Sequence, residues 1–432
     1  MSNEIIKKAQ NAKKAAIQVA ALSAKMRSEA LIKIAKELEA KKDIIFSANN
    51  TDLDIAEKNN LDKPLLKRLA FDNKKLKEVV DGLHALSKMD DPLGEVLMSR
   101  QLDKGLDLYR ISCPIGVMAI IFESRPDALV QISSLCLKSA NAVLLKGGSE
   151  AKHTNKALFE VIQNASVSCG MPKDWITLME TRDDVANILE LDEYIDLIIP
   201  RGSNAFVKHI MDNSNIPVLG HADGICHVYV DESADIDKSI PVCVDAKTQY
   251  VAVCNAMETL LVHKEIAPEF LPKLKSAMDE KKVKLLGCGK TREIIEVEAA
   301  DDADWDTEYL DYILSIKIVE DINDAVEHIN AHGSGHTDVI LTNDKKNADM
   351  FIALVDSAGV YVNASSRFAD GFVYGLGAEV GISTSKIHAR GPVGIEGLMT
   401  YKYVLKGDYH YILPYKSGDK KFKHKDTNKK SL

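Results

Sequence analysis

The residue with the clearest chemical potential in this sequence is Cys254. It follows Lys247-Thr-Gln-Tyr-Val-Ala-Val, a polar run that ends a predicted helix, and it precedes the strand-like run Thr259–Val262. A thiol at such a junction can face a cleft, where its thiolate acts as a nucleophile. Free cysteine is more often a buried core residue, and the chain has seven, so the assignment depends on the segments around Cys254.

Two other segments have residue types that bind ribose or phosphate. Lys146-Gly-Gly-Ser149 places a lysine at the carboxyl end of a predicted strand and two glycines before a helix. Gly202 and Ser203 follow another predicted strand in the same way. A cation and open backbone N–H groups suit such ligands, although a surface lysine before a turn is the simpler interpretation of Lys146 alone.

A further segment, His221-Ala-Asp-Gly-Ile-Cys-His227, contains possible metal ligands. Ligand atoms occur on His221, Asp223, Cys226 and His227, but their spacing matches no metal site that we can name, and the residues from His227 onward are typical of a strand. We therefore predict no metal site.

The elements that must position these residues form a regular alternation of strands and helices. Apolar runs of strand length occur at Val117–Phe122, Val143–Lys146, Ile176–Met179 and Leu197–Ile199. This order predicts a parallel α/β sheet, whose ligands bind beyond the carboxyl ends of the strands. A second α/β pattern begins after residue 246 and includes Cys254. Its predicted strands are Met257–Val262, Tyr312–Val319 and Val339–Thr342.

The remaining segments are simpler. Glu95–Arg100 and Leu106–Ile111 form a predicted hairpin, and the segment before it is predicted to form packing helices. Thr400–Leu405 and Tyr409–Leu413 are further β-rich segments. Residues 416–432 are rich in lysine and are predicted to be a basic, flexible tail.

Composition sets further limits. With 432 residues, 46% of them hydrophobic, the chain has room for two or three domains. Its net charge of −9 argues against a nucleic-acid partner. The cysteines form no CxxC pair and are odd in number, which is typical of a reduced, cytoplasmic protein. The sequence has neither a signal peptide nor a run of about 18 apolar residues, so we predict no membrane association.

Taken in order, several segments resemble the aldehyde dehydrogenase superfamily. They are Pro114-Ile-Gly-Val117, Leu145-Lys146, Gly202-Ser203, Cys254, Glu308-Tyr-Leu-Asp311 and Val362-Asn363. Longer motifs resemble the γ-glutamyl phosphate reductase family within it, including Ile121-Phe-Glu-Ser-Arg-Pro-Asp127, Val253-Cys-Asn-Ala-Met-Glu258 and His388-Ala-Arg-Gly-Pro-Val-Gly394. The resemblance covers nearly the whole chain up to residue 410.

The resemblance implies an α/β fold with a Rossmann-type parallel-sheet cofactor domain, a second α/β catalytic domain and a β oligomerisation arm. We assign residues 1–94 and 113–246 to the cofactor domain, 247–386 to the catalytic domain, and 95–112 with 387–415 to the arm. Superfamily arms reach a neighbouring subunit, which implies a homodimer or a dimer of dimers. A monomer whose hairpins both pair within one chain is the alternative.

The resemblance also implies roles for individual residues. Cys254 aligns with the nucleophile, and backbone N–H groups at Cys254 and Asn255 would stabilise the oxyanion. The matching cofactor-side positions are Lys146 and Ser149 for a ribose, Gly202 and Ser203 for the pyrophosphate, and Glu308 for the nicotinamide ribose.

Ser149 bears on the choice of cofactor. NAD-preferring relatives often have a glutamate at this position, whereas a neutral serine does not repel a 2′-phosphate that Lys146 and Lys152 attract. We therefore predict NADPH. Glu150 would oppose this preference if its side chain turned toward the ribose.

The chain departs from the hydrolytic members of the superfamily at two points. It has Gly220-His-Ala-Asp223 where they have the glutamate that activates water, and Ser124-Arg125-Pro126 where they have an oxyanion asparagine. Without the hydrolytic base, a thioester would survive until hydride arrives. A planar guanidinium suits phosphate or carboxylate, and we predict that the substrate is bound by Ser124, Arg125, Asn363 and Arg367.

The activity implied by the resemblance is the NADPH-dependent reduction of L-glutamyl 5-phosphate to L-glutamate 5-semialdehyde, with release of phosphate, in proline biosynthesis. Cys254 would attack the acyl phosphate and form a thioester, which hydride then reduces. One alternative is a hydrolytic or CoA-acylating aldehyde dehydrogenase, and another is an inactive subunit that channels for a glutamate 5-kinase. Association of the active enzyme with that kinase is a further hypothesis, because acyl phosphates decompose in water.

Overall fold

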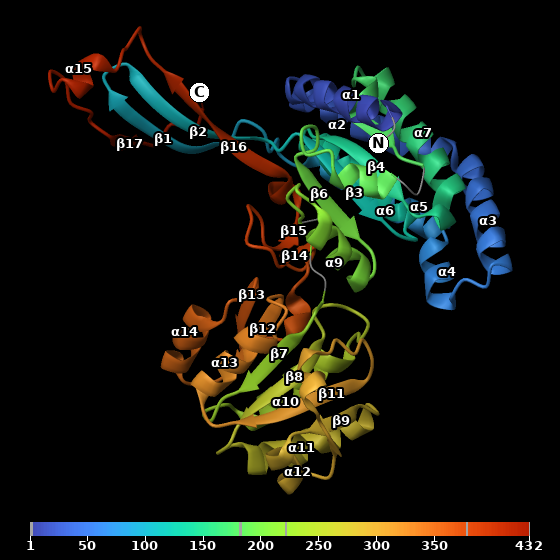
Figure 1. The fold of residues 1–432 in the computed structure, drawn as a ribbon, viewed down its shortest axis with the longest axis vertical. Helices are drawn as coiled ribbons and strands as arrows, with labels where there is room; N and C mark the ends of the chain where they lie inside the picture. The colour runs from blue at the N-terminus through green and yellow to red at the C-terminus, as the bar shows by residue number, and fades with distance from the viewer. Residues whose placement is uncertain (1–2, 181–183, 221–222, 377–378, 432) are drawn as a thin grey trace.

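The computed structural model describes residues 3–180, 184–220, 223–376 and 379–431. In these ranges the chain forms two parallel α/β units and an antiparallel sheet that projects away from both (Figure 1). None of the helices within the described ranges has the length and apolar character needed to cross a membrane.

The first unit is built on a parallel sheet in the order β5-β4-β3-β6. Its strands are β3 (Val117–Phe122), β4 (Ala142–Gly147), β5 (Ile176–Leu178) and β6 (Leu197–Arg201). Side chains of successive residues in β3 enter different core clusters, Ile120 on one face and Ile121 on the other. Because both faces are buried, each strand is an almost continuous apolar run, and the four predicted strands are confirmed.

Helices cover both faces of this sheet. One face packs against α2 (Ala24–Ala40), α5 (Asn73–Lys88), α6 (Pro126–Lys138) and α7 (Lys152–Ser168). The other packs against α1 (Asn3–Ala20), α8 (Asp184–Leu189) and α9 (Asn204–Asn213). Outside the first layer, α3 (Lys42–Lys58) contacts α7 and is followed by α4 (Lys63–Leu69). The N-terminal segment is therefore helical, as predicted.

The second unit is a parallel sheet in the order β10-β9-β11-β8-β7-β12-β13. Its strands are β7 (Cys226–Val230), β8 (Met257–His263), β9 (Lys284–Gly287), β10 (Glu298–Ala299), β11 (Ile313–Val319), β12 (Thr337–Leu341) and β13 (Gly359–Val362). One face packs against α10 (Ile236–Thr248) and α11 (Ala267–Glu280), followed by α12 (Gly289–Ile294). The other packs against α13 (Ile322–His332) and α14 (Lys345–Leu354).

The predicted domain boundary at residue 246 differs from this arrangement. β7 lies between β8 and β12, and α10 shares their core, so the chain enters the second sheet at Cys226, the first residue of β7. The apolar run in β7 indicates a buried strand, but it does not indicate which of two sheets the strand joins. That choice depends on partners more than 100 residues away in the chain, such as Val339 opposite Val228.

The projecting sheet is the arm, in the antiparallel order β16-β2-β1-β17 (Figure 1). It contains β1 (Val96–Asp103), β2 (Leu106–Pro114), β16 (Met399–Lys406) and β17 (Lys425–Thr427). The predicted hairpin of β1 and β2 is present. A two-stranded sheet of β14 (Gly381–Ser383) and β15 (Gly391–Val393) lies between the arm and the second unit (Figure 1).

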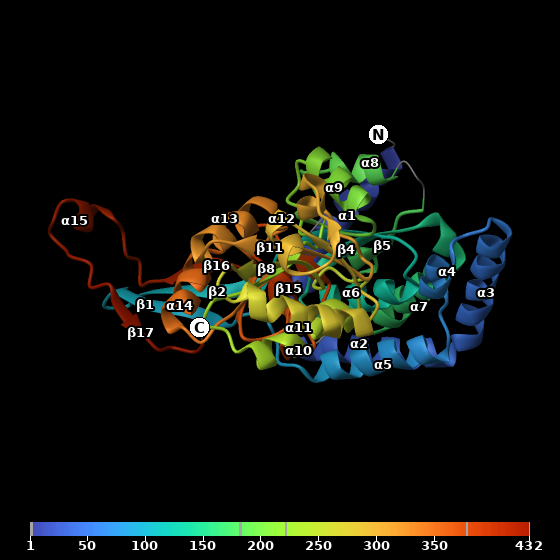
Figure 2. The same cartoon turned by 90° about the horizontal axis from the view of Figure 1, so that it is seen from below.

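Two predictions about the C-terminal segments were wrong. The segment 409–413 is not a strand, and the short helix α15 (Leu413–Lys416) begins at its end. The segment 416–432 is not simply a free tail, because β17 pairs with β1. Acidic residues of the hairpin account for this: Lys429 Nζ lies 2.7 Å from Asp107 Oδ2, and Lys423 pairs with Asp103. Figure 2 shows the returning segment alongside the hairpin.

Candidate active site

Cys254 lies in the turn between α10 and β8, at the amino edge of the second sheet. The neighbouring strand β7 begins at Cys226, whose thiol donates to the Cys254 carbonyl oxygen at 3.2 Å. Gly224 packs directly against the nucleophile, since a Cβ there would lie 2.3 Å from Cys254 Cα. Only glycine allows this approach, so the Gly224 backbone fixes one wall beside Cys254.

The Cys254 thiol is in an environment that keeps it protonated. Burial raises its pKa to about 12, and the charge of Glu308 acts in the same direction. The charge of Arg201 opposes this and lowers the pKa. Formation of the thiolate therefore depends on nearby positive charge.

Asn255 holds the nucleophile turn in place. Its side chain is buried, and Nδ2 donates to the carbonyl oxygen of Ala369 at 3.0 Å. The Asn255 carbonyl accepts from Ser366 Oγ at 2.7 Å. Among the described residues, the Asn255 backbone N–H has no hydrogen-bond acceptor, which leaves it available beside the sulfur.

Lys146 and Ser149 lie at the carboxyl end of β4, as the strand pattern predicted. Lys146 is buried and its Nζ donates to the Gly147 carbonyl at 2.6 Å, whereas Ser149 is exposed. A small cavity at this edge is lined by Gly147, Gly148, Ser149, Lys152, Asn155, Leu178, Met179 and Glu180. It combines the apolar side chains of Leu178 and Met179 with one cation, Lys152, and one carboxylate, Glu180, and such a mixed lining suits a nucleoside.

Gly202 and Ser203 form the turn that starts α9. The Ser203 backbone N–H donates to Glu123 Oε2 at 3.1 Å, and a Cβ on Gly202 would lie 2.6 Å from the same oxygen. A carboxylate therefore already occupies this helix N-terminus, where the helix dipole favours anions. Sequence reasoning did not identify Glu123.

Glu308 brings the two units together. Its Oε2 accepts from Asn204 Nδ2 at 2.5 Å, and Asn204, the first residue of α9, also donates to Asp223 at 2.9 Å. Burial raises the pKa of Glu308. The carboxyl edge of the first sheet thus faces the amino edge of the second, with Cys254 near Glu308.

Two arginines, Arg201 and Arg367, interact electrostatically with Cys254, and a third, Arg125, interacts with Arg201. Arg125, just before α6, and Arg201, at the end of β6, are partly buried, and burial lowers the pKa of each. Arg367 Nε donates to Gln249 Oε1 at 2.9 Å. Within the described ranges, the Arg125 and Arg201 guanidinium groups donate no hydrogen bond, so both are available to an anion.

Arg201 was not among the predicted site residues. Electrostatic interactions link it to Cys254 and to Glu379, and the Gly381 backbone packs against its guanidinium group. The signal was available, because Arg201 ends a buried parallel strand directly before the Gly202 turn.

Two predicted substrate ligands, Ser124 and Asn363, make hydrogen bonds within the chain. Ser124 donates through its backbone N–H and its hydroxyl to Glu150 Oε1, at 2.6 and 2.7 Å. Asn363 accepts from the Thr342 N–H at 2.9 Å and donates to the Thr342 carbonyl at 2.8 Å. Both side chains brace neighbouring loops, because short polar groups readily bond the nearby backbone.

The candidate metal ligands disperse in the fold. His227 is buried in β7 and its Nδ1 lies 3.0 Å from Asp338, while Asp223 pairs with Asn204. His221 lies outside the described residues. Within the ranges that the structure covers, no group of three or more potential ligands could hold a metal ion.

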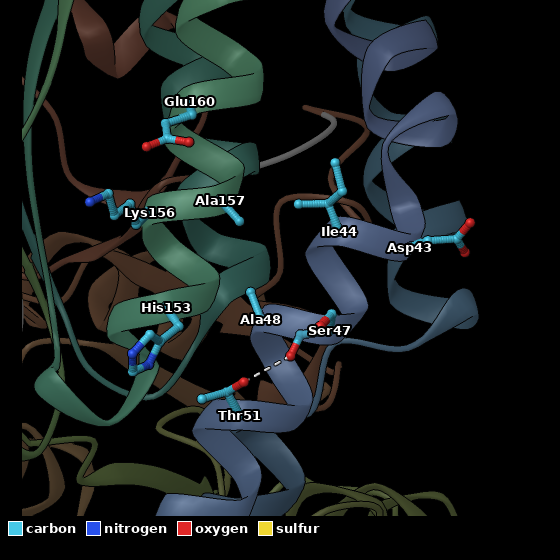
Figure 3. Close-up of a pocket in the computed structure, with 9 residues that line it drawn as sticks. All are labelled: Asp43, Ile44, Ser47, Ala48, Thr51, His153, Lys156, Ala157 and Glu160. Carbon is cyan, nitrogen blue, oxygen red and sulfur yellow. Dashed lines mark hydrogen bonds between the residues drawn. The ribbon is translucent and has the colours of Figure 1, made fainter.

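A separate groove of about 570 Å³ lies between α3 and α7 (Figure 3). It is lined by Asp43, Ile44, Ser47, Ala48, Thr51, His153, Lys156, Ala157 and Glu160. His153 Nδ1 lies 2.7 Å from the buried Asp52 carboxylate. No residue of this groove belongs to the surroundings of Cys254 described above.

Comparisons with known proteins agree with this geometry. The profile of the aldehyde dehydrogenase family matches residues 2–286. A γ-glutamyl phosphate reductase from Acetivibrio thermocellus is 60% identical over 96% of this chain and 97% of its own, and one from Ruminiclostridium cellulolyticum is 58% identical over 97% of each. The crystal structure of γ-glutamyl phosphate reductase from Thermotoga maritima is 41% identical with a TM-score of 0.93, covering 95% of this chain and all of that one. The chain therefore belongs to the aldehyde dehydrogenase family and, within it, to the γ-glutamyl phosphate reductases.

Proposed function

We propose that this protein reduces L-glutamyl 5-phosphate to L-glutamate 5-semialdehyde with NADPH, releasing phosphate, in proline biosynthesis. The observation that carries the proposal is a partly buried cysteine, Cys254, that interacts with Arg201 and Arg367 and lies close to the edge proposed to bind the cofactor. The relatives named above support the choice of substrate.

The chain's own groups account for the acyl-transfer step. The Cys254 thiolate forms a bond to the acyl carbon, and the carbon–oxygen bond to phosphate breaks, so phosphate leaves with the electron pair. Arg201 and Arg125 stabilise the leaving charge, and the Asn255 N–H stabilises the oxyanion. Asp223 is the acidic residue of the Gly220–Asp223 segment, which replaces the motif that holds the water-activating glutamate in hydrolytic relatives. Its carboxylate accepts a hydrogen bond from Asn204, so this segment supplies the thioester with no free carboxylate base to activate water.

The cofactor-side residues fit a nicotinamide dinucleotide. The Ser203 N–H already binds an oxyanion, Lys146 supplies a cation, and Glu308 can hold a ribose near Cys254. When bound, the reduced cofactor supplies hydride to the thioester carbon. Collapse of the resulting thiohemiacetal breaks the carbon–sulfur bond, releases the aldehyde and restores the thiolate.

An assay in the reverse direction tests this function. With glutamate 5-semialdehyde as substrate, we expect reduction of NADP⁺ that requires inorganic phosphate. Turnover that proceeds equally well without phosphate would favour a hydrolytic aldehyde dehydrogenase, and turnover that requires CoA would favour an acylating one. Absence of turnover despite a reactive Cys254 thiol would favour the non-enzymatic alternative.

We predict a preference for NADPH over NADH. Glu150 is held by Ser124, so positions 149 and 150 direct no carboxylate into the ribose cavity, which Lys152 and Glu180 line. Ser149→Glu should lower kcat/KM for NADPH by about tenfold or more, because it places like charge beside the 2′-phosphate, and NADH should be little affected. The two specificity constants measured for both proteins decide the question, and a wild-type preference for NADH would contradict it.

We further predict that the arm mediates a homodimer, with a dimer of dimers possible on the same principle. β16 pairs with β2 within the chain, but among the described residues no strand pairs with its other edge, and Tyr401, Tyr403 and Leu405 of this strand are exposed. Such an edge invites pairing with a second chain. Light scattering should give a mass of at least twice 47.5 kDa, whereas the monomer mass would reject the arm's role. Association with a glutamate 5-kinase stays a hypothesis.

A further inference from the structure

A buried ion pair closes the turn that carries the nucleophile. Lys247 Nζ lies 2.5 Å from Glu258 Oε2, and both side chains are fully inaccessible to solvent. Lys247 is near the end of α10, and Glu258 is the second residue of β8. Cys254 lies between them in sequence, so the pair joins the two ends of the nucleophile turn.

The same pair contacts the loop that carries Glu308. Glu258 Oε1 accepts from the Leu310 backbone N–H at 3.3 Å. Lys247 Nζ lies 6.0 Å from the centre of the Tyr309 ring. Leu310 has a φ of 53°, a left-handed conformation that non-glycine residues rarely adopt without local support.

Stability alone does not explain this pair. Removing two charges from water is costly, and apolar replacements of buried ion pairs often leave stability unchanged or improve it. Burial lowers the pKa of Lys247 and raises that of Glu258 to about 7, which reflects this cost. The pair instead makes directional contacts with two loops at once.

We infer that the Lys247–Glu258 pair is a positioning device that fixes the Glu308 loop relative to Cys254. The inference rests on the proposed function, because it takes Glu308 as the ligand of the nicotinamide ribose. Glu258 acts through the Leu310 N–H, and neither charged group touches substrate. The pair thereby sets the distance between the group that holds the cofactor and the sulfur that holds the acyl carbon.

Two double variants separate positioning from stability. Lys247→Met with Glu258→Met keeps the volume but removes the acceptor for Leu310, whereas Lys247→Gln with Glu258→Gln is also uncharged and keeps an amide acceptor. NADPH affinity is measured by fluorescence titration, and folding by the thermal midpoint. We expect the Met pair to weaken NADPH binding by about tenfold with little change in midpoint, and the Gln pair to stay within about threefold of wild type.

A double-mutant cycle with Glu308→Gln completes the test. If the pair acts through Glu308, the Met pair should cause no further loss of NADPH affinity in the Glu308→Gln background. Additive losses, or unchanged affinity in a folded Met pair, would overturn the inference. If the Met pair does not fold, a loss of about tenfold in the Gln pair would overturn it. A Glu308→Gln variant that binds NADPH normally would count against the assignment of Glu308 to the cofactor. Failure of the phosphate-dependent assay would instead count against the proposed reaction.

Discussion

Replacing Cys254 by alanine should reduce phosphate-dependent oxidation of glutamate 5-semialdehyde by more than about 10⁴-fold, since the proposed thioester forms on the Cys254 sulfur. NADPH affinity should remain close to that of the wild type, because the thiol is not among the groups proposed to hold the cofactor, which are Lys146, Ser203 and Glu308. Initial rates and fluorescence titration measure the two quantities. Retained turnover in this variant would reject the mechanism.

Cys288 provides the matched control for this experiment. It is partly buried, its Sγ lies 3.3 Å from Thr291 Oγ1, and its pKa is lowered, although burial opposes the effect. Cys288→Ala should keep wild-type activity.

The alkylation rate of Cys254 should depend on pH. Because burial raises the pKa of Cys254 to about 12, its thiolate fraction and its alkylation rate should rise as the pH increases from 7 to 10. The Cys254→Ala variant should lack the alkylation that occurs at this thiol.

Replacing Arg201 by methionine should lower kcat/KM by about 10²–10³-fold, the loss typical for removing one group that stabilises developing negative charge. Much of the loss should appear as a raised KM for phosphate in the reverse reaction. Arg201→Lys should recover only part of the activity, because an ammonium keeps the charge but lacks the planar fork. Steady-state kinetics with varied phosphate measures both.

An exposed arginine controls for the change in net charge. Arg68, near the end of α4, is exposed, and its charge has an electrostatic effect on Arg125. Arg68→Met should therefore leave the KM for phosphate nearly unchanged. An Arg201→Met enzyme with a normal KM for phosphate would show that the leaving group is bound elsewhere.

The sequence predicted those parts of the fold that depend on local pattern. β3 was placed correctly because a strand buried on both faces must be apolar at nearly every position. The sequence pattern could not predict which of the two sheets β7 joins, since the partner strands of β7 are distant in the chain. The pairing of β17 was missed because a run dominated by lysine is typical of a solvated tail, and its acidic partners lie on another segment.

The candidate site divides along a similar line. Cys254, Lys146 and Glu308 were predicted because the resemblance aligns their positions, and the structure places each at the meeting edges of the two sheets. Asn363 was assigned to substrate from its residue type, yet its amide bonds Thr342 at both ends. The direction in which a polar side chain points depends on its neighbours in space, which the sequence does not show. Glu123 was not predicted for the same reason.

The contact between Glu123 and the Ser203 N–H has a consequence for turnover. Because this helix N-terminus already binds a carboxylate, docking of a dinucleotide in the proposed function would exchange one anion for another instead of filling an open site. The gain in free energy is the difference between two similar contacts, which moderates affinity. When the oxidised cofactor departs, Glu123 can return to the vacated N–H, so this donor is satisfied in both states. Product release is the slow step in many enzymes, and in the proposed function this exchange would assist release of the cofactor.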